Sequence, residues 1–240
     1  MRWEYVYGAN TAEEILLSAK RRIFKIIIAG HCSPKTEKAL KVAREKKIPI
    51  VVRSSKYLDK ISRGGNHQGI MLEVEEISSI NLCQALESAK GKNEIWVAID
   101  SVTDPMNLGS IIRSCACFGV RNVVIPQRRT APVTPAMQKS ASGALEKVNI
   151  IKVVNLNQTI IALKKKGFWI YGADGKGEDI RKVDFAFPAL IIMGSEGEGI
   201  HLKTKEHCDK LVSLPQKGGV ESLNAAVAAG IFMYEVSRRI

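Results

Sequence analysis

Short apolar runs alternate with longer amphipathic stretches along most of this chain. The runs are rich in Ile and Val and nearly continuous, which is typical of strands buried on both faces of a parallel sheet. The stretches between them have apolar residues at helical spacing. This alternation predicts an α/β fold with parallel strands. We expect strands at residues 25–29, 49–52, 70–74, 94–100, 122–125, 168–172, 189–193 and 210–214.

Helices are expected between these strands. Ser33 can cap the first helix, because a serine hydroxyl accepts a hydrogen bond from a backbone N–H of the first turn, and Pro34 suits the position that follows. Ser222 is expected to cap the last helix, which would place Leu223 and Asn224 in its first turn. The predicted helices are residues 35–46, 55–62, 109–118, 158–166 and 222–239, and a further helix and strand are expected within 137–154.

Residues 75–91 interrupt this pattern, since they contain few apolar residues and only one weak helix. They mark the expected boundary between two unequal α/β domains, and a chain of 240 residues is long enough for two hydrophobic cores. We therefore predict a first domain at residues 1–76, a linker at 77–92 and a second domain at 93–240.

The composition argues against a membrane protein and a secreted one. Hydrophobic residues make up 45% of the chain and charged residues 25%, as in an ordinary globular protein. No apolar run approaches the roughly 20 residues that cross a membrane, and the N-terminus lacks the pattern of a signal peptide. The five cysteines form neither a disulfide framework nor a metal-binding pattern, so Cys115 and Cys117 are interpreted as core thiols. We expect a cytoplasmic protein without a metal site.

Positive charge is concentrated near the N-terminus. The net charge is +12, and residues 20–63 hold 14 Lys or Arg against three acidic residues, an excess of +11. This density favours a surface that binds the phosphate backbone of RNA, although a solvated face would also explain it. His67 and Gln68 are compatible with RNA contact or with a structural turn. The candidate phosphate contacts are Lys20, Arg21, Arg22 and Lys25, followed by Lys46 and Lys47.

Three segments that combine small, flexible residues with polar side chains each follow a predicted strand of the second domain. They are residues 107–113 (NLGSIIR), residues 194–199 (GSEGEG), and residues 214–215 (LP) together with 222–224 (SLN). Loops at the carboxyl ends of parallel strands are where α/β proteins bind ligands, so the three segments predict one shared pocket.

The first segment leads into a helix whose apolar residues cluster within one arc. Arg113 projects from the opposite side of this helix, so it is free to meet a ligand, although alone it could be a solvated helix residue. Asn107 lies near the start of the segment, where it could also be a simple turn residue. Their position beside two other glycine-containing loops favours a functional role for both.

The second segment differs from a dinucleotide-binding loop. Its glycines are spaced G-x-x-G-x-G rather than G-x-G-x-x-G, and it lies near the end of the chain. Glu196 and Glu198 are poorly suited to phosphates, and they favour a ligand with positive charge or hydroxyl donors. S-adenosylmethionine has a sulfonium, an amino group and a ribose, and it has no phosphate.

The three ordered segments resemble the signature motifs of the SpoU (TrmH-like) family of RNA 2'-O-ribose methyltransferases. Residues 100–119 (DSVTDPMNLGSIIRSCACFG) are similar to the first motif over its whole length. Residues 138–148 (QKSASGALEKV) and 166–174 (KGFWIYGAD) resemble the intervening segments of the branch that methylates large-subunit ribosomal RNA. Residues 8–10 and 66–69 resemble the small L30e-like RNA-binding domain of that branch, so the resemblance covers nearly the full chain.

The resemblance implies an α/β-knot methyltransferase domain with a deep trefoil knot, preceded by the L30e-like domain. It implies S-adenosylmethionine as cofactor, a ribose 2'-hydroxyl of a 23S rRNA guanosine as target, and a homodimer formed by the C-terminal domains. Arg113 is the proposed catalytic residue of the family, and no metal is required. The implied catalytic set is Asn107, Arg113, Glu196 and Asn224, and the implied cofactor-binding set is Gly194, Gly199, Leu214, Ser222 and Leu223.

Two departures from the family pattern lie near the third motif. Ala226 stands where members often have Ser, and Gln216 where they often have Met. Because of these two departures, the sequence does not decide which nucleotide is preferred or which residues form the wall of the cofactor pocket. The alternatives are a transfer RNA substrate, or a non-catalytic RNA-binding or ribosome-assembly protein that keeps the fold.

Overall fold

The computed structural model describes residues 2–30, 33–89, 91, 93–219 and 222–240, which form two compact units. The first unit comprises Met1–Ser78 together with Val133–Lys147. The second comprises Ser79–Pro132 and Val148–Ile240. The predicted second domain, residues 93–240, therefore includes a segment that packs with the first unit instead. Residues 90 and 92 of the predicted linker lie outside the described residues.

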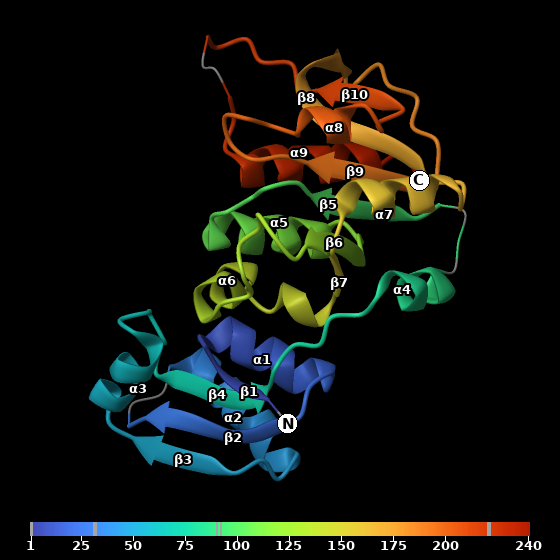
Figure 1. The fold of residues 1–240 in the computed structure, drawn as a ribbon. Coiled ribbons are helices and arrows are strands. Elements are labelled where there is room, and N and C mark those ends of the chain that lie inside the picture. The colour runs from blue at the N-terminus through green and yellow to red at the C-terminus, as the bar shows by residue number, and fades with distance from the viewer. Residues whose placement is uncertain (1, 31–32, 90, 92, 220–221) are drawn as a thin grey trace. The chain divides into compact units, whose positions relative to one another are not determined.

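The first unit contains a mixed four-stranded sheet in the order β1-β4-β2-β3 (Figure 1). Strand β4 is antiparallel to both β1 and β2, and only β2 and β3 are parallel, so the expectation of parallel strands is wrong for this unit. The elements are β1 (Trp3–Tyr7), α1 (Ala9–Ser18), β2 (Ile23–Ala29), α2 (Pro34–Glu45), β3 (Ile50–Arg53), α3 (Ser55–Ser62), β4 (Ile70–Glu75), α6 (Pro135–Ala141) and the 3-10 helix η1 (Ala144–Glu146).

The two faces of this sheet are covered by different helices. Ile26, Leu72 and the apolar residues of α1 and α2 form one core cluster, whereas Ile27 and Met71 pack with Leu58 of α3 in another. Successive side chains of a strand point to opposite faces, so the apolar strands supply both clusters. Burial of the apolar side chains on both faces stabilises the unit.

The second unit contains a six-stranded, fully parallel sheet in the order β10-β8-β9-β5-β6-β7. This unit confirms the predicted α/β fold with parallel strands. Its elements are α4 (Leu82–Ser88), β5 (Ile95–Ile99), α5 (Pro105–Cys117), β6 (Asn122–Pro126), β7 (Asn149–Val153), α7 (Leu156–Lys164), β8 (Trp169–Asp179), β9 (Ala189–Met193), α8 (Leu202–Lys205), β10 (Lys210–Ser213) and α9 (Ala225–Ser237).

The strands of this second sheet are buried on both faces, as their continuous apolar sequences predict. Trp96 and Ala98 of β5 pack in a cluster with residues of α4 and α7. Val97 and Ile99 alternate with them and are also fully buried, so they point to the opposite face. Helices α5 and α9 contact each other, and Figure 1 shows both beside the sheet. The sheet therefore holds the starts of α5 and α9 at defined positions.

Three helices of the second unit begin at other residues than expected, and one of them, α7, begins at Leu156, two residues before its predicted start. Helix α5 begins at Pro105, four residues before the predicted start, because the Asp104 carboxylate caps it by accepting from the Met106 and Asn107 amides at 3.1 Å each. Helix α9 begins at Ala225, and its cap is Asn224 rather than Ser222. The Asn224 side-chain oxygen accepts from the backbone N–H groups of residues 226 and 227 at 2.9 and 3.2 Å.

Strand β8 extends beyond its predicted end at residue 172. Its pairing with β10 shifts register, because Gly172 pairs with Leu211 and Glu178 pairs with Val212, the next residue of β10. Residues 173–177 therefore bulge out of the ladder at the carboxyl end of the strand, near the loops that follow β9 and β10.

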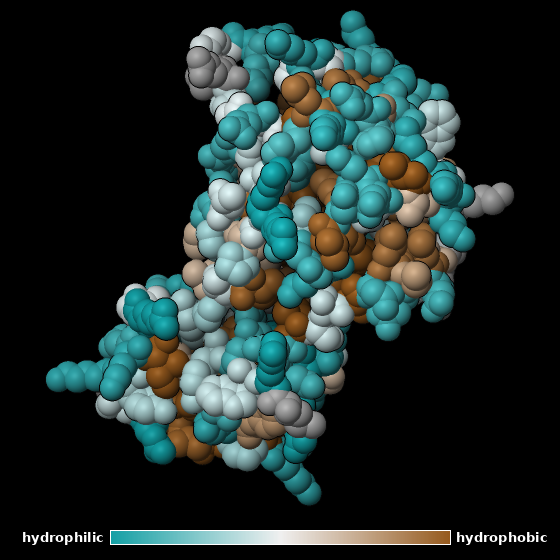
Figure 2. All heavy atoms as spheres, in the orientation of Figure 1, coloured by the Kyte–Doolittle hydropathy of each residue, from teal (hydrophilic) through white to brown (hydrophobic). Residues whose placement is uncertain are grey.

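The surface of the described residues is mostly polar in one view, with hydrophobic patches between the hydrophilic side chains (Figure 2). None of the helices in the described part of the chain has the length and apolar character that crossing a membrane requires. Cys115 is buried, as expected of a core thiol, but Cys117, the last residue of α5, is exposed, so the interpretation as a core thiol is wrong for Cys117.

Candidate functional site

The site lies where the order of strands reverses in the second sheet. The chain passes from β5 to β6 and β7 on one side, and then places β8, β9 and β10 on the other side of β5. Strands β5 and β9 are neighbours, so the loops that follow them meet at the carboxyl edge of the sheet. This topological position is where open parallel sheets bind ligands.

Three polar side chains from the three predicted segments come together there. The Asn107 side-chain amide donates to Glu196 Oε1 at 3.1 Å, and the Asn224 amide donates to Asn107 Oδ1 at 3.0 Å and also to Glu196 Oε1. Glu196 is separated from Asn107 by 89 positions in the sequence and from Asn224 by 28. The structure thus brings together three of the four residues of the predicted catalytic set.

Glu196 also binds the beginning of α9. Its Oε1 accepts from the Ala225 backbone N–H at 3.0 Å. A carboxylate at a helix N-terminus is stabilised by the unpaired N–H groups and by the helix dipole. The contact therefore fixes the glycine-rich loop against α9, and the Asn224 cap is held by the same carboxylate.

The glycine-rich loop is a tight hairpin. Ser195 and Gly199 exchange backbone hydrogen bonds of 3.1 Å in both directions. Gly194 has no room for a side chain, because an added Cβ would lie 2.1 Å from the Gly199 carbonyl carbon. Gly197 has a φ of 85° and Gly199 a φ of 68°, which favours glycine at both positions. The glycines of this segment thus shape the loop rather than cradle a phosphate.

A cavity of about 540 Å³ opens beside this hairpin, within the size range of small-molecule sites. Its apolar wall includes Met193, Val212 and Phe232. Glu196 also lines the cavity, so the polar cluster forms part of its wall. All five residues predicted to bind the cofactor line it, namely Gly194, Gly199, Leu214, Ser222 and Leu223.

The β8 bulge also contributes to this cavity, which the sequence pattern did not predict. Asp174 lines the cavity, forms an ion pair with Lys205 and accepts from the Lys176 backbone N–H at 2.8 Å. Burial raises the pKa of Asp174, but the hydrogen bonds from Lys205 and Lys176 outweigh it, so the net pKa lies below the ordinary value. The only sequence signal was the last residue of the KGFWIYGAD segment.

Arg113 lies on α5 and is exposed. Its guanidinium makes no hydrogen bond or ion pair with any residue that the structure describes, and it does not line the 540 Å³ cavity. A side chain that leaves five N–H donors unpaired is available to bind an anion. The geometry therefore leaves Arg113 free for a ligand, but it does not join Arg113 to the Asn107 cluster.

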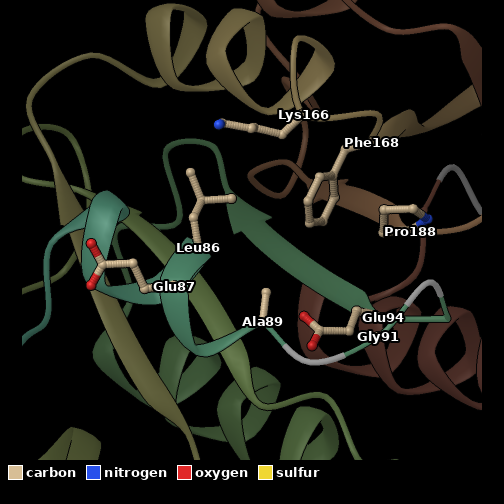
Figure 3. Close-up of a pocket in the computed structure, with 8 residues that line it drawn as sticks. All are labelled: Leu86, Glu87, Ala89, Gly91, Glu94, Lys166, Phe168 and Pro188. Carbon is tan, nitrogen blue, oxygen red and sulfur yellow. The ribbon is translucent and has the colours of Figure 1, made fainter.

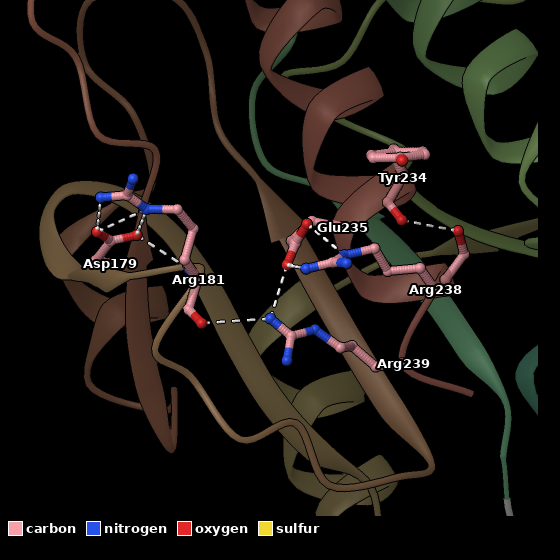
Figure 4. Close-up of polar contacts among 7 residues, drawn as sticks. Asp179, Arg181, Tyr234, Glu235, Arg238 and Arg239 are labelled. Atoms are coloured by element: carbon pink, nitrogen blue, oxygen red, sulfur yellow. Dashed lines mark hydrogen bonds and ion pairs between the residues drawn. The ribbon is translucent and has the colours of Figure 1, made fainter.

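The carboxyl end of α9 is anchored by a separate polar network, shown in Figure 4. Glu235 pairs with Arg238 at 2.7 Å and with Arg239 at 2.7 Å, and Arg239 donates to the Arg181 carbonyl oxygen at 3.3 Å. The hydrogen bond from Arg238 lowers the pKa of Glu235. These contacts attach the end of α9 to the segment that follows β8, so both ends of the helix are held.

Another cavity, of about 310 Å³, lies at the opposite edge of the sheet (Figure 3). Glu94, Phe168 and Pro188 line it and immediately precede β5, β8 and β9, so it lies at the amino ends of these strands. In Figure 3 the Phe168 ring and Leu86 point toward the hollow. This edge lacks the polar cluster, and ligands of parallel sheets bind at the carboxyl edge.

Arg21 is not available to RNA, which contradicts its predicted role. Its side chain is 4% exposed and forms ion pairs with Glu4 at 2.8 Å and with Glu146 at 2.6 Å. Gln138 of α6 donates to the same Glu4 at 2.6 Å. Burial raises the pKa of Glu4 against the lowering effect of the Arg21 guanidinium. Arg21 therefore stabilises the first unit by joining residues 133–147 to the N-terminal strands.

The other candidate phosphate contacts differ in exposure. Arg22 is exposed and lies over the Phe24 ring at 5.3 Å, and Lys47 is also exposed. Lys20 is exposed as well, whereas Lys25 is half-buried and pairs with Glu73 at 2.7 Å. Lys46 donates to the Leu16 carbonyl oxygen. Fewer positive charges in this region are thus available to a ligand than the number of Lys and Arg residues in its sequence suggests.

His67 and Gln68 have structural roles. His67 is buried and bonds Asp59 Oδ1 at 3.0 Å, while its Nδ1 accepts from the Gly69 amide at 3.0 Å. The Gln68 side-chain oxygen accepts from the Ala9 amide at 2.9 Å. These contacts support the turn before β4. Within the described ranges, no group of three or more His, Cys, Asp or Glu side chains could hold a metal ion.

Two protein-family models match this chain. The model described as SpoU rRNA Methylase family matches residues 94–234, which include all three segments of the site. The model described as RNA 2'-O ribose methyltransferase substrate binding matches residues 5–79. Together they cover most of the sequence.

Similar proteins carry related descriptions. An uncharacterized tRNA/rRNA methyltransferase of Synechocystis is 39% identical over 98% of this chain, and the chain spans 62% of that relative's length. The 23S rRNA (guanosine-2'-O-)-methyltransferase RlmB of Coxiella burnetii is 36% identical, with 98% of this chain and 95% of the relative covered. The structure of the SpoU methyltransferase AviRb from Streptomyces viridochromogenes, in complex with AdoMet, has a TM-score of 0.81 at 22% identity, with 99% and 90% covered, and so shows a shared fold.

Proposed function

The chain belongs to the SpoU rRNA methylase family, and we propose that it transfers a methyl group from S-adenosylmethionine to a ribose 2'-hydroxyl of RNA, with a guanosine of 23S rRNA as the target. The observation that carries the proposal is the hydrogen-bonded cluster of Asn107, Glu196 and Asn224 beside a cavity. Three segments that are distant in sequence supply one residue each, which a structural turn alone does not require.

The cavity of about 540 Å³ fits the cofactor in size and chemistry. Its apolar wall, with Phe232 and Leu214, suits the adenine ring, and backbone groups near Gly194 and Leu223 can bind the adenosine. The carboxylates of Asp174 and Glu196 suit a ligand with positive charge and hydroxyl donors. Bound S-adenosylmethionine would supply a methyl group on a positively charged sulfur that is already a good leaving group.

The protein's own task is to orient the 2'-hydroxyl and to stabilise the charge that develops on its oxygen. Arg113 is exposed on α5, and its guanidinium can bind the neighbouring phosphate and lower the energy of a developing alkoxide. A guanidinium stays protonated in proteins, so electrostatic stabilisation suits it better than proton abstraction. Asn107, Glu196 and Asn224 hold the starts of α5 and α9 in register, and Ser222 lines the adjoining cavity.

The first unit is proposed to bind the RNA. Five of the six cations predicted from the sequence remain as candidates once Arg21 is excluded, and Arg22 and Lys47 are the best exposed without a carboxylate partner. The substrate-binding model that matches residues 5–79 supports this assignment. The remaining candidates are Lys20, Lys25 and Lys46.

The domain organisation is part of the proposal. Residues 1–76 would form an L30e-like RNA-binding domain with which residues 133–147 pack, residues 77–92 a linker that includes α4, and the rest of residues 93–240 a methyltransferase domain with a deep trefoil knot. The parallel order β10-β8-β9-β5-β6-β7 and the family membership support the knot. The mixed sheet of the first unit, with helices on both faces, is compatible with the L30e-like fold. A cytoplasmic location is also part of the proposal, because a ribosomal RNA substrate lies in the cytoplasm.

We also infer a homodimer formed by the second unit. Val227, Ile231 and Tyr234 are 52%, 42% and 57% exposed and recur at helical spacing, so they form an apolar stripe on α9. The opposite side of α9 is buried against its own unit through Ala229 and Met233. Light scattering should give about twice 26.4 kDa, and Ile231→Glu should give the monomer. A monomeric and fully active wild-type protein would refute the dimer.

The function is tested by mapping 2'-O-methyl groups in total RNA from cells with and without the gene, using mass spectrometry. We expect one guanosine of 23S rRNA to lose its methyl group and to regain it when the purified protein and S-adenosylmethionine are added. Loss of a transfer RNA methyl group would support the alternative substrate. An unchanged RNA pool from a protein that still binds RNA would favour the non-catalytic alternative.

A further inference from the structure

A second cavity at the carboxyl edge of the large sheet is not used by the function proposed above. Its volume is about 680 Å³, and the loops that follow β5, β6 and β7 line it together with the segment after the glycine-rich hairpin. All of its lining residues belong to the second unit. We call it the cation cleft, because Arg128, Arg129 and Lys203 line it.

The free charge in the cation cleft is positive. Arg128, Arg129 and Lys203 are exposed, and none of them forms an ion pair or hydrogen bond with the residues that the structure describes. Asp100 is the one acidic residue of the lining, and it is 7% exposed. Three cations without a carboxylate partner repel one another, so the cleft is suited to an anionic ligand.

The charge of Asp100 is already used within the protein. Its Oδ1 accepts from His201 Nδ1 at 3.0 Å, and its Oδ2 accepts from the His201 backbone N–H at 3.0 Å. The carboxylate therefore places the proton on Nδ1 of the imidazole. His201 Nε2 has no partner among the described residues, and His201 lines the cleft, so Nε2 can bond a hydroxyl or an amino group of a ligand.

Two exposed aliphatic side chains give the cation cleft an apolar surface in addition to its positive charge. Val154 and Leu202 line it and are 81% and 78% exposed, the two highest values among the exposed large hydrophobic residues that the structure describes. Neither helps to form a core of its own unit. Exposed apolar surface beside cations is the combination that a nucleotide uses, with the base on the apolar side and the phosphate at the cations.

The cation cleft is connected to the proposed catalytic site through two segments. The loop after β5 lines the cleft at Asp100 and Ser101, and it continues to Asp104, which caps α5. The hairpin of residues 194–199 lines the cofactor cavity, and residues 201–204 line the cleft directly after it. An RNA strand at the site could therefore extend into the cleft.

We propose that the cation cleft binds a nucleotide of single-stranded RNA that flanks the methylated one. Its phosphodiester contacts Arg128, Arg129 and Lys203, and its base packs against Val154 and Leu202. The inference rests on the proposed function for the identity of the RNA. The binding of single-stranded RNA at the cleft can be measured independently of methyl transfer.

The first test measures binding of fluorescein-labelled decauridylate to the full chain by anisotropy over a range of salt concentrations. Arg128→Ala/Arg129→Ala should weaken binding about tenfold. Binding to this variant should also release about two fewer counterions, so its affinity should depend less steeply on the salt concentration. The matched control is Lys152→Ala/Lys165→Ala, which removes two exposed cations of the same unit that line neither cavity. Equal effects of the two double variants would overturn the proposal.

The second test separates a nucleotide site from a general anion site. Val154→Ser/Leu202→Ser keeps every cation, so it should weaken decauridylate binding severalfold and leave polyphosphate binding unchanged. Equal loss for both ligands, or no loss for either, would overturn the placement of the base. Decauridylate with 4-thiouridine should cross-link to residues 154–157 or 201–204, and cross-links found only elsewhere would refute the cleft.

The outcomes also distinguish this proposal from the function on which it rests. If the wild-type protein methylates no RNA but the arginine substitutions still weaken decauridylate binding, the RNA-binding role of the cleft is supported and the proposed methyl transfer is refuted. If methylation is observed and the arginine variant matches the control variant in decauridylate binding and in KM for RNA, the proposed methyl transfer is supported and the RNA-binding role of the cleft is refuted. Binding of S-adenosylmethionine should be unchanged in every variant.

Discussion

The cations that the sequence singled out in the first unit and those that line a cavity in the second unit differ in their partners. In the first unit, several cations are paired within the protein: Arg21 with Glu4 and Glu146, Lys25 with Glu73, and Lys147 with Glu14. In the second unit, four of the described cations, all with proposed roles in RNA binding, are exposed and unpaired. These four are Arg113, Arg128, Arg129 and Lys203.

The difference shows that charge density along a sequence does not identify the charges that meet a ligand. The excess of +11 in residues 20–63 is real, but a guanidinium that neutralises a buried and a half-buried carboxylate cannot leave them for a phosphate. By contrast, Arg128, Arg129 and Lys203 of the second unit line a cavity and have no ion-pair partner among the described residues. Substitutions of paired and unpaired groups in both units test this contrast.

The largest effect is expected from Arg21→Ala. The substitution leaves the buried Glu146 and the half-buried Glu4 without a counter-charge, so the free energy of unfolding of the first unit should fall by about 3–5 kcal/mol. Urea unfolding combined with hydrogen exchange of the first-unit amides would measure it. The matched control is Arg22→Ala, at the exposed neighbour, which should change stability by less than about 0.5 kcal/mol. Unchanged stability in Arg21→Ala with weaker RNA binding would restore its predicted phosphate contact.

Arg113→Ala should have the next largest effect. Methyl transfer should slow by about 10²–10³-fold, since a charge that stabilises the transition state is removed, while calorimetry should show unchanged S-adenosylmethionine affinity. Arg113→Lys should restore little activity, because an ammonium lacks the planar fork of donors. Arg121→Ala removes another exposed arginine of the same unit and should retain activity. Similar rates for the Arg113 and Arg121 variants would remove Arg113 from the catalytic set.

A smaller effect is expected at the exposed cations of the first unit. Arg22→Ala/Lys47→Ala should weaken RNA binding modestly, and the slope of log affinity against log salt should fall by about 0.7–0.9 for each phosphate that is no longer bound. Anisotropy titrations at several salt concentrations measure the slope. Lys147→Ala serves as the paired control, because Lys147 of the same unit already pairs with Glu14 at 3.0 Å. An unchanged slope in the double variant would indicate that this region is a solvated face.

The smallest effect concerns acid conditions and Asp174. Its pKa in the folded protein lies below the ordinary value of about 4, so its ion pair stabilises the fold above that pH, and this contribution disappears as the pH falls through the folded pKa. The wild-type protein should therefore lose stability below about pH 4 more steeply than Asp174→Asn. Thermal unfolding between about pH 3 and pH 7 would compare them. Parallel curves would show that the Asp174–Lys205 pair does not stabilise the fold.

The extent of successful prediction differs between the strands and the site. Strand β9 has the predicted bounds, Ala189–Met193, because a strand buried on both faces is a continuous apolar run. Strand β1 was missed, because polar side chains interrupt its WEYVY sequence and only its antiparallel pairing with β4 makes it a strand. The cap of α9 was assigned to Ser222 because serine and asparagine are about equally good caps, and the position of Glu196 decides in favour of Asn224.

The sequence by itself determined the family, the parallel sheet of the second unit and the residues of its three loops, because these depend on local apolar pattern and on motifs of fixed spacing. Only the tertiary structure decided which polar groups meet. It joined Asn107 to Glu196 across 89 positions, added Asp174 from a bulge, and buried Arg21 against Glu146. Pairing of charges depends on distance and burial in three dimensions, which the order of residues does not state.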